Sequence, residues 1–535
     1  MFFVKKTRLQ EKVGKLLVIG FPGKSVTAEV KELIHDYHVG SIILFSRNIG
    51  TPEEVVHLTT ALQKEAKAAG HEQPLLIGID QENGVVRRLG KGATIFPGAM
   101  ALGATNHPDY AYDISLATGK ELKALGINWN FAPVLDVNNN PNNPVIGVRS
   151  FGEDPAQVAS FGCASMKGMQ DAGVMTAVKH FPGHGDTHVD SHIDLPVIDH
   201  RLTRLEEVEL IPFKACIEKG ADAVMAAHIH FPAIDTAESV PATLSKKMIT
   251  DLLRQQLAFT GMIITDCLEM DAIVNTIGTE KGAVESLKAG VDLTMISHTY
   301  ERQIGAIQAI MNAFENGELY LADLEASIQR ISIYKERYVW WEDALQDNAK
   351  ESLAIVGSEK HEKLAWETYV AGVTIVENDG ILPLQVNPSS RILVLEPVHE
   401  LVTKAEDKDV DSFSLGDAVR FYHETADSEP LPHPGNENQA DHLIEKAKKY
   451  DYVILGTQTL LPDHPHIALV NKLVETGVQL IGVGMRNPYD LLYIKGVNAF
   501  IHTYEPNAPA LKVAAGAIFG EVIVNGQLPV RLTRN

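Results

Sequence analysis

The sequence predicts a (β/α)8 barrel followed by a smaller three-layer α/β domain. Eight short apolar runs, separated by helix-like stretches, occur before about residue 317. Five more apolar runs follow residue 350, and a length of 535 residues exceeds what one hydrophobic core usually organises. We therefore expect a catalytic barrel over residues 1–317, a helical linker over 318–350 and a C-terminal α/β sandwich domain over 351–535.

The eight expected barrel strands are KLLVIGF, GSIILF, PLLIGID, NWNFAPVLDV, MTAVKHF, ADAVMAAHI, GMIITD and GVDLTMIS. Helices are expected between them, for example at TAEVKELIHDYH, TPEEVVHLTTALQKEAKAA, DPAQVASFGCASMKGMQDA and RLEEVELIPFKACIEKG. Several of these stretches open on Thr-Pro or Asp-Pro and close near Gly, which are common signals of a helix start and a helix end. This repeated alternation is the pattern of a barrel of parallel strands.

The second domain is predicted from the apolar runs LAIVG, RILVLEP, YDYVILGT, QLIGVGM and NAFIHTY. The segment IVGSEKHEKL after the first run lacks the glycine spacing of a dinucleotide-binding or phosphate-binding loop. We therefore expect this domain to bind no cofactor.

The composition excludes several classes of protein. A net charge of -22 argues against a nucleic-acid surface, which needs clustered Lys and Arg. The three cysteines are widely spaced, so neither a disulfide framework nor a thiolate zinc site is expected. No secretion signal and no apolar run long enough for a bilayer is found. We expect a cytoplasmic protein without a membrane, nucleic-acid or required protein partner.

Polar side chains stand where the predicted strands end, which is where barrel enzymes carry their active sites. They are Asp80, Asp136, Lys179, His180, His228, Asp266, Ser297 and His298.

The segment KHFPGHGDTHVDSH brings together histidines and aspartates after the fifth predicted strand. Its Pro-Gly and Gly-Asp pairs break regular structure, so we expect a loop above the barrel. In DSH, Asp190 can fix the tautomer of His192 and stabilise its imidazolium, which makes His192 a candidate general acid/base. The spacing does not favour a metal site. Solvated loop histidines are the simplest alternative.

The segment GMIITDCLEM delivers Asp266 to a strand end. This carboxylate could cap the next helix through backbone N–H groups. It could also act as the nucleophile of a retaining glycosidase, in which it attacks the anomeric carbon while His192 protonates the departing oxygen. The spacing alone leaves both roles open.

Two further segments bear on the substrate. IGIDQENGVVRRLG places Asp80 at a strand end before Arg87 and Arg88. Carboxylate and guanidinium groups can accept hydrogen bonds from sugar hydroxyls and donate to them in fixed directions. Charge pairing at the surface is the alternative. AHIH contains His228 and His230, a pair that is also found in metal-dependent amidohydrolase barrels. That pair usually lies on the first strand, whereas this one lies on the sixth.

The segment KHFPGHGDTHVDSH resembles the catalytic loop of glycoside hydrolase family 3 β-N-acetylglucosaminidases of the NagZ type, in their two-domain form. GSIILFSRN, IGIDQENG, NFAPVLDV, NPVIGVRSFGED, VMAAHIHFPAID, GMIITDCLEMDAI and AGVTIVENDGILPL support the resemblance. It implies that Asp266 is the nucleophile, His192 the general acid/base and Asp190 its partner. It also implies a sugar subsite lined by Asp80, Arg88, Arg149, Lys179, His180 and His228.

This resemblance implies release of terminal GlcNAc from cell-wall (muropeptide) fragments or chitooligosaccharides, without metal or cofactor. The small carbohydrate substrate would be the only partner. Such enzymes commonly read DQEGG followed by Arg, whereas Asn83 and Val85 occupy two of these positions here. The alternatives that stay open are a phosphorylase that uses phosphate in place of water, an amidohydrolase-like metal enzyme and a barrel that only binds sugar.

Overall fold

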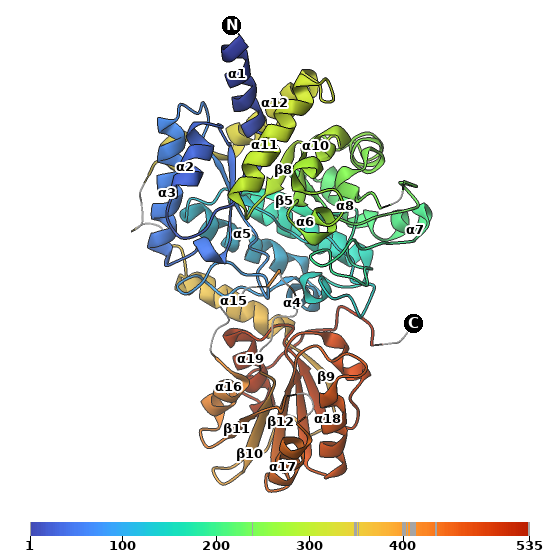
Figure 1. The fold of residues 1–535 in the computed structure, drawn as a ribbon. Helices are drawn as coiled ribbons and strands as arrows, with labels where there is room; N and C mark the ends of the chain where they lie inside the picture. The colour runs from blue at the N-terminus through green and yellow to red at the C-terminus, as the bar shows by residue number, and fades with distance from the viewer. Residues whose placement is uncertain are drawn as a thin grey trace.

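A computed structural model describes residues 2–237, 239–346, 350, 353–398, 403, 405–406, 413–433 and 436–532. These residues form a closed barrel of parallel strands and a separate mixed sheet, so the predicted fold class is confirmed (Figure 1). The barrel strands are β1 (Leu17–Ile19), β2 (Ser41–Leu44), β3 (Leu76–Ile79), β4 (Trp129–Asn130), β5 (Met175–Phe181), β6 (Ala223–Ala226), β7 (Met262–Cys267) and β8 (Leu293–Ile296). Each lies within one of the eight apolar runs, except that β7 extends one residue beyond GMIITD.

Helices surround the barrel, and two of them, α3 and α6, begin at the Thr-Pro and Asp-Pro pairs that signal a helix start. Thr51 and Glu54 form a reciprocal capping box at the start of α3, and the Asp154 side chain accepts the first backbone N–H groups of α6. The surrounding helical segments are α2 (Ala28–His35), α3 (Pro52–Ala68), α5 (Pro108–Ala124), α6 (Pro155–Asp171), α8 (Leu210–Glu218), a π-helix (Lys247–Gln256), α10 (Thr279–Ala289) and α11 (Tyr300–Glu315). Shorter or peripheral helices are α1 (Phe2–Gly14), α4 (Ala99–Ala104), α7 (Leu202–Glu207) and α9 (Asp271–Val274).

One predicted helix, RLEEVELIPFKACIEKG, is wrong as a single element, because the structure divides it into α7 and α8. Pro212 stands in the first turn of α8, the part of a helix that tolerates proline, so the helix starts anew just before it.

The expected helical linker contains α12 (Leu321–Tyr338) and α13 (Trp341–Ala344). Two buried carboxylates that precede barrel strands hold α12. Asp292 accepts hydrogen bonds from Ser327 and Arg330 at 2.8 Å, and Asp222 accepts one from Tyr338 at 2.9 Å. Both carboxylates lie at the amino ends of strands, so α12 closes the end of the barrel that faces away from the second domain (Figure 1).

The second sheet has the strand order β11-β10-β12-β13-β14-β9, and only β9 is antiparallel to its neighbour. The strands are β9 (Thr374–Asn378), β10 (Ile392–Glu396), β11 (Asp427–Pro430), β12 (Tyr452–Thr457), β13 (Gln479–Gly484) and β14 (Ala499–His502). The helices are α15 (Glu359–Gly372), α16 (Leu415–Tyr422), α17 (Glu437–Ala447), α18 (Pro465–Glu475) and α19 (Ala508–Phe519).

The predicted strand LAIVG is wrong, because residues 353–357 form turns. Val356 from this segment is buried against the barrel core, and Gly357 adopts a φ of 65° at a place where a Cβ would collide with the Gly92 carbonyl oxygen. A short apolar run of this kind can bury its side chains without joining a sheet. Strands β9 and β11 were not among the predicted runs.

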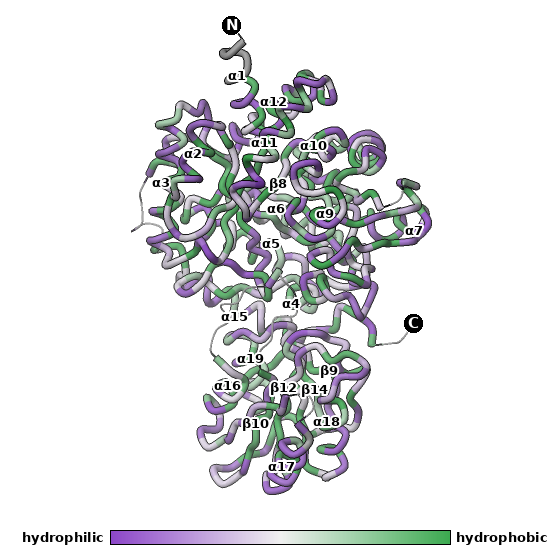
Figure 2. Tube along the Cα trace, in the orientation of Figure 1, coloured by the Kyte–Doolittle hydropathy of each residue, from purple (hydrophilic) through white to green (hydrophobic). Residues whose placement is uncertain are grey.

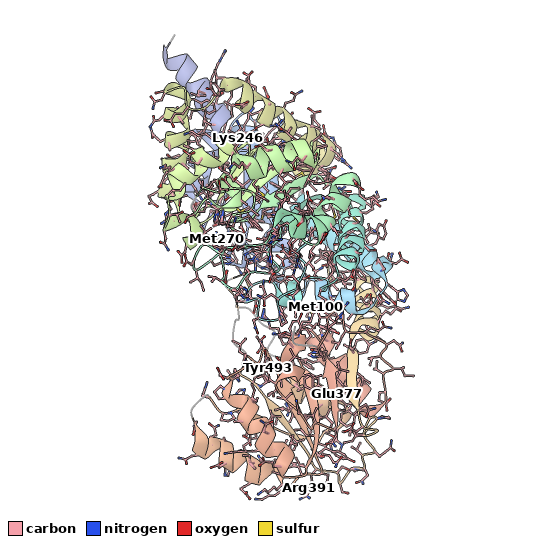
Figure 3. The ribbon with its side chains drawn as sticks, turned by 90° about the vertical axis from the view of Figure 1, so that its right-hand side faces the viewer. Met100, Lys246, Met270, Glu377, Arg391 and Tyr493 are labelled. Carbon is pink, nitrogen blue, oxygen red and sulfur yellow. The ribbon has the colours of Figure 1, made fainter. Side chains whose placement is uncertain are left out.

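The carboxyl ends of both sheets face each other across the domain junction. Asn138 Nδ2 donates to the Tyr489 hydroxyl at 3.1 Å, and the Gly98 N–H donates to Glu505 Oε1 at 2.9 Å. In Figure 3, Arg391, which precedes β10, lies at the far end of the second domain, whereas Tyr493, which follows β13, lies toward the barrel.

A shared hydrophobic core joins the two domains, with α4 and α15 between them (Figure 1). It contains Phe96, Leu102, Ile114 and Phe161 from the barrel together with Tyr369, Leu384, Val394 and Leu511 from beyond it. Hydrophilic stretches lie at the periphery, for example on α7 (Figure 2). Within the described residues, no helix combines the length and hydropathy needed to cross a bilayer.

Candidate active site

A cavity of about 590 Å³ opens at the carboxyl ends of the barrel strands. Seven of the nine predicted site residues line it: Asp80, Arg88, Arg149, Lys179, His180, His192 and Asp266. The other two, Asp190 and His228, lie behind lining residues. The structure therefore gathers residues that are up to 186 positions apart in the sequence around one cavity.

Asp190 and His192 lie on the loop that follows β5. Asp190 Oδ1 lies 2.7 Å from His192 Nδ1 and accepts the backbone N–H of His192 at 2.9 Å. Burial raises the pKa of the Asp190 carboxyl, but the hydrogen bond and charge of His192 outweigh burial and bring this pKa below its usual value. An ionised carboxylate beside Nδ1 favours a proton on that nitrogen. Nε2 is then the ring nitrogen that can exchange a proton with a substrate.

Asp266 stands near the end of β7, and its Oδ1 accepts the backbone N–H of Cys267 at 2.7 Å. Burial raises the pKa of this carboxyl, but the electrostatic interactions with the His228, His180 and His192 rings and the hydrogen bond from Cys267 more than offset burial and lower the pKa below its usual value. The side chain is thus a carboxylate at neutral pH that lines the same cavity as His192. An ionised carboxylate and an imidazole on one cavity can act as nucleophile and proton donor.

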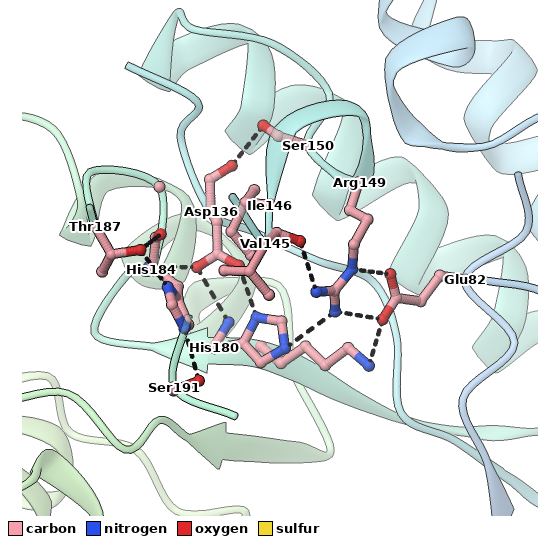
Figure 4. A network of polar contacts seen from close by, with 12 residues as sticks. Glu82, Asp136, Val145, Ile146, Arg149, Ser150, His180, His184, Thr187 and Ser191 are labelled. Carbon is pink, nitrogen blue, oxygen red and sulfur yellow. Dashed lines mark hydrogen bonds and ion pairs between the residues drawn. The ribbon is translucent and has the colours of Figure 1, made fainter. Parts of the chain in front are cut away.

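Charged side chains form a network along the cavity floor (Figure 4). Glu82 accepts two hydrogen bonds from the Arg149 guanidinium, each at 2.8 Å, and lies 2.6 Å from Lys179 Nζ. Lys179 Nζ also donates to Asp80 at 2.6 Å. Burial disfavours the charge on Lys179, but Asp80 and Glu82 outweigh this cost and raise its pKa. Fixed donors and acceptors of this kind suit the hydroxyl groups of a sugar.

Asp136 connects this network to the loop that carries His192. Its Oδ2 lies 2.7 Å from His180 Nδ1, and its Oδ1 accepts the backbone N–H of His184 at 2.7 Å. His184 lies 2.8 Å from Thr187 and 3.0 Å from Ser191, which precedes His192 (Figure 4). Burial lowers the pKa of His184 to about 4, so its ring is neutral and orders the loop by hydrogen bonds.

His228 lies behind the lining of the cavity, against the backbone of Cys267. Its side chain is fully buried, with Nδ1 2.8 Å from the Thr243 hydroxyl and Nε2 2.9 Å from the Cys267 carbonyl oxygen. It is absent from the cavity lining and supports the backbone beside Asp266. Both ring nitrogens are engaged inside the protein, so the geometry gives His228 a supporting position.

The cavity lining also contains Glu82, Glu269 and Arg47, which were not predicted, and Ser297 and His298, which follow a predicted strand. Glu269 accepts the backbone N–H groups of His298 at 2.5 Å and Thr299 at 3.1 Å, and His298 Nδ1 lies 3.2 Å from Arg47. Glu82 and Glu269 each follow a predicted strand-end aspartate by two or three residues, which is the one signal that could have identified them. The second domain adds Ala405 and Glu406 to the lining.

The geometry of the histidine-rich segment does not gather metal ligands. His200 Nε2 lies 2.6 Å from Asp186, and His188 lies 3.2 Å from Asn140. Throughout the part of the chain that the structure describes, no group of three His, Cys, Asp or Glu side chains has the arrangement of a metal site.

The comparisons with known proteins agree with this geometry. The model of the glycosyl hydrolase family 3 N-terminal domain matches residues 8–333. A β-hexosaminidase A of Pseudoalteromonas piscicida is 39% identical over 383 residues, which cover 67% of this chain and 63% of that protein. The chain thus matches less than two thirds of that relative. A β-hexosaminidase of Xylella fastidiosa (strain M23) is 36% identical over 53% of this chain and 83% of that protein.

Solved structures give the same result for the whole fold. A family 3 β-N-acetylglucosaminidase from Paenibacillus sp. str. FPU-7 has a TM-score of 0.90 at 37% identity, covering 98% of this chain and 99% of that one. A fungal multi-domain β-N-acetylglucosaminidase of the same family has a TM-score of 0.91 at 39% identity, covering 98% of this chain and 60% of that one. A β-glucoside phosphorylase has a TM-score of 0.81 at 22% identity over 99% of this chain and 95% of that one, a likeness of fold alone.

Proposed function

Because this chain belongs to glycoside hydrolase family 3 and is a glycoside hydrolase, we propose that it is a retaining exo-β-N-acetylglucosaminidase. The observation that carries the proposal is that Asp266 and the Asp190–His192 pair meet at one cavity. The relatives named β-hexosaminidase and β-N-acetylglucosaminidase support a substrate with terminal β-GlcNAc.

The proposed reaction has two steps. In the first, the Asp266 carboxylate attacks the anomeric carbon while the His192 imidazolium gives its Nε2 proton to the departing oxygen, so a glycosyl ester forms on Asp266. In the second, neutral His192 takes a proton from water, and the oxygen of that water displaces Asp266 from the anomeric carbon. Asp190 stabilises the imidazolium and orients its ring.

We propose that the sugar is held by Asp80, Arg88, Arg149, Lys179 and His180 at the cavity. The network around Glu82 supports this role, because it fixes the Arg149 and Lys179 cations in direction as well as in place. An array that is ordered before the substrate arrives loses little side-chain entropy on binding.

We further propose that the substrates are cell-wall (muropeptide) fragments or chitooligosaccharides processed in the cytoplasm. The three cysteines are free thiols, as expected for a reducing compartment. The two classes of substrate differ in the sugar that is attached to the terminal GlcNAc. Both would place that GlcNAc in the same cavity.

Phosphate is the second candidate acceptor, because the general base is an imidazole that carries no negative charge to repel an anion. Hydrolysis is preferred, since the relatives at 36% and 39% identity are named hexosaminidases, whereas the phosphorylase is a likeness of fold alone.

The test is turnover of an aryl β-GlcNAc by the wild-type enzyme, with the first-formed product observed by proton NMR. The proposal expects β-GlcNAc as the initial product, with and without phosphate. GlcNAc 1-phosphate that forms in place of free GlcNAc would establish the phosphorylase. Absence of turnover would leave a barrel that only binds sugar.

A further inference from the structure

The second domain reaches into the barrel cavity. Ala405 and Glu406, from the connection that follows β10, line the cavity together with Arg88 and Asp266. We propose that Glu406 binds a hydroxyl group of the sugar in this cavity, so that the substrate site is built from both domains. This inference rests on the proposed function, because it requires a sugar in the cavity.

The topology of the second sheet places Glu406 where such sheets bind ligands. From β10 the chain continues to β11 on one side, whereas β12 lies on the other side, so the strand order reverses between β10 and β12. Open α/β sheets bind ligands outside the carboxyl ends of their strands at such a reversal. Here those ends face the barrel, so the connection after β10 meets the sugar cavity.

Two contacts fix the position of this segment. Arg88 Nη1 from the barrel donates to the Ala405 carbonyl oxygen at 2.8 Å. Arg486, which follows β13, donates through Nη2 to Glu406 Oε1. The side chains of Glu406 and Arg486 are only 4% and 6% exposed, so this pair is an ordered part of the cavity wall.

The chemistry of Glu406 fits a sugar hydroxyl. A carboxylate has about four acceptor positions on its two oxygens, so it can accept hydrogen bonds from several donors at once. Sugar hydroxyls can donate hydrogen bonds. A hydrogen bond to a charged acceptor is stronger than one between neutral groups, so it can distinguish a sugar that carries the hydroxyl in the right orientation from one that does not. A carboxylate that is held by an arginine from its own domain is therefore suited to accept a hydrogen bond from the substrate.

The competing explanation is that Glu406 and Arg486 only join two connections of the second domain. It predicts a loss of stability when Glu406 is changed, but no dependence on any particular sugar hydroxyl. A cycle that combines changes in the protein with changes in the substrate separates the two explanations.

The experiment uses the full chain and aryl β-GlcNAc substrates that lack the 3-, 4- or 6-hydroxyl. For wild type, removal of the contacted hydroxyl should lower kcat/KM by about 10- to 100-fold. In Glu406→Ala the same removal should have less than about a 2-fold effect, because the acceptor is gone. Glu406→Gln keeps the shape of the side chain and should give an intermediate result. Glu424→Gln, at an exposed position of the second domain, is the matched control and should behave as wild type.

Equal effects of every deoxy substrate in wild type, Glu406→Ala and Glu406→Gln would overturn the inference, even if overall activity or stability fell. Wild-type turnover of the parent substrate reports separately on the proposed function. If that turnover were absent, calorimetric binding of GlcNAc and its 3-, 4- and 6-deoxy forms would make the same comparison, and equal deoxy penalties would again overturn it.

Discussion

Asp190 Oδ1 makes two contacts with a single residue, His192: it lies 2.7 Å from Nδ1 of the ring and accepts the backbone N–H at 2.9 Å. The carboxylate thus fixes the ring relative to its own backbone. Asp190 and His192 belong to the segment that begins with Lys179 and His180. His184 anchors this segment through its contacts with Asp136 and Ser191.

We predict that Asp190→Asn slows turnover of a GlcNAc disaccharide, but less than His192→Ala does. The imidazole remains in place, whereas the negative charge that orients and stabilises it is lost. The measurement is kcat for both variants at one pH. A variant Asp190→Asn that is as slow as His192→Ala, or as fast as wild type, would contradict the proposed partnership.

We predict that Glu82→Gln destabilises the protein at pH 7 by about 3 to 5 kcal/mol, because it leaves Arg149 and Lys179 buried without their shared carboxylate. Burial raises the pKa of Glu82, but Arg149 and Lys179 outweigh burial and lower it. A carboxyl whose folded pKa is lowered stabilises the protein above its unfolded pKa, and this contribution is lost as pH falls. The effect of Glu82→Gln should therefore shrink in acid.

Urea unfolding at pH 7 and at acid pH measures this difference. Asp171→Asn is the control, because it removes an exposed ion pair with Lys167 on α6 and should cost at most about 1 kcal/mol. Equal losses for the two variants would show that the buried network contributes nothing particular to stability.

A third prediction concerns acid stability and His502, which is buried at the end of β14. Burial lowers its pKa to about 4, against only a partial opposing effect of the Gly484 carbonyl. Between this value and the unfolded pKa near ~6.5, the unfolded chain binds more protons, so stability falls as pH falls through this window. His502→Phe should reduce that slope by up to about 1.4 kcal/mol per pH unit.

The measurement is the free energy of unfolding between pH 7 and pH 4. His442→Phe, at an exposed position on α17, should keep the wild-type slope. An unchanged slope in His502→Phe would show that this histidine is not held neutral in the folded protein.

A chain that ends near residue 345 should fail to give a stable monomer. The cut would expose Phe96, Leu102 and Phe161, which share one core with Tyr369 and Leu511 of the second domain. Size-exclusion chromatography and thermal unfolding would measure this. A monomeric, cooperatively folded fragment would show that the barrel does not depend on the second domain. Of the predicted division into residues 1–317, 318–350 and 351–535, this fragment tests the boundary before the C-terminal domain.

The sequence predicts the barrel well because each strand is a short apolar run with a polar end, as at Asp80 and Asp266. It also predicts Asp190 and His192 as a pair, because two residues that are two positions apart on a tight loop can contact each other directly. Glu82 could not be assigned in the same way, since its partners Arg149 and Lys179 are distant in the sequence and meet only in the closed barrel.

Other features depend on tertiary packing alone. The run ending at Gly357 is apolar enough for a strand, yet it packs its Val356 into the barrel core. His228 ends a strand run, but its ring turns inward to Thr243 and Cys267. Glu406 lies in a connection without periodic pattern, and its place at the cavity follows from the junction of two sheets.

The central claim is that His192 moves protons and Asp266 carries the glycosyl group. Asp266→Ala should abolish turnover of every β-GlcNAc substrate, because no covalent intermediate can form. His192→Ala should lower turnover of a disaccharide by about 10²- to 10⁴-fold, since a sugar alkoxide needs a proton to depart. His188→Ala, an exposed histidine on the same loop, is the control and should stay near wild type.

The most direct measurement is turnover of an activated nitrophenyl β-GlcNAc and of a GlcNAc disaccharide by His192→Ala, each with and without azide. We expect the nitrophenyl substrate to form the intermediate on Asp266 and azide to release it as β-glycosyl azide, because neither step needs the imidazole. The disaccharide should stay slow with azide present. Equal losses on both substrates, with no azide product, would contradict the account.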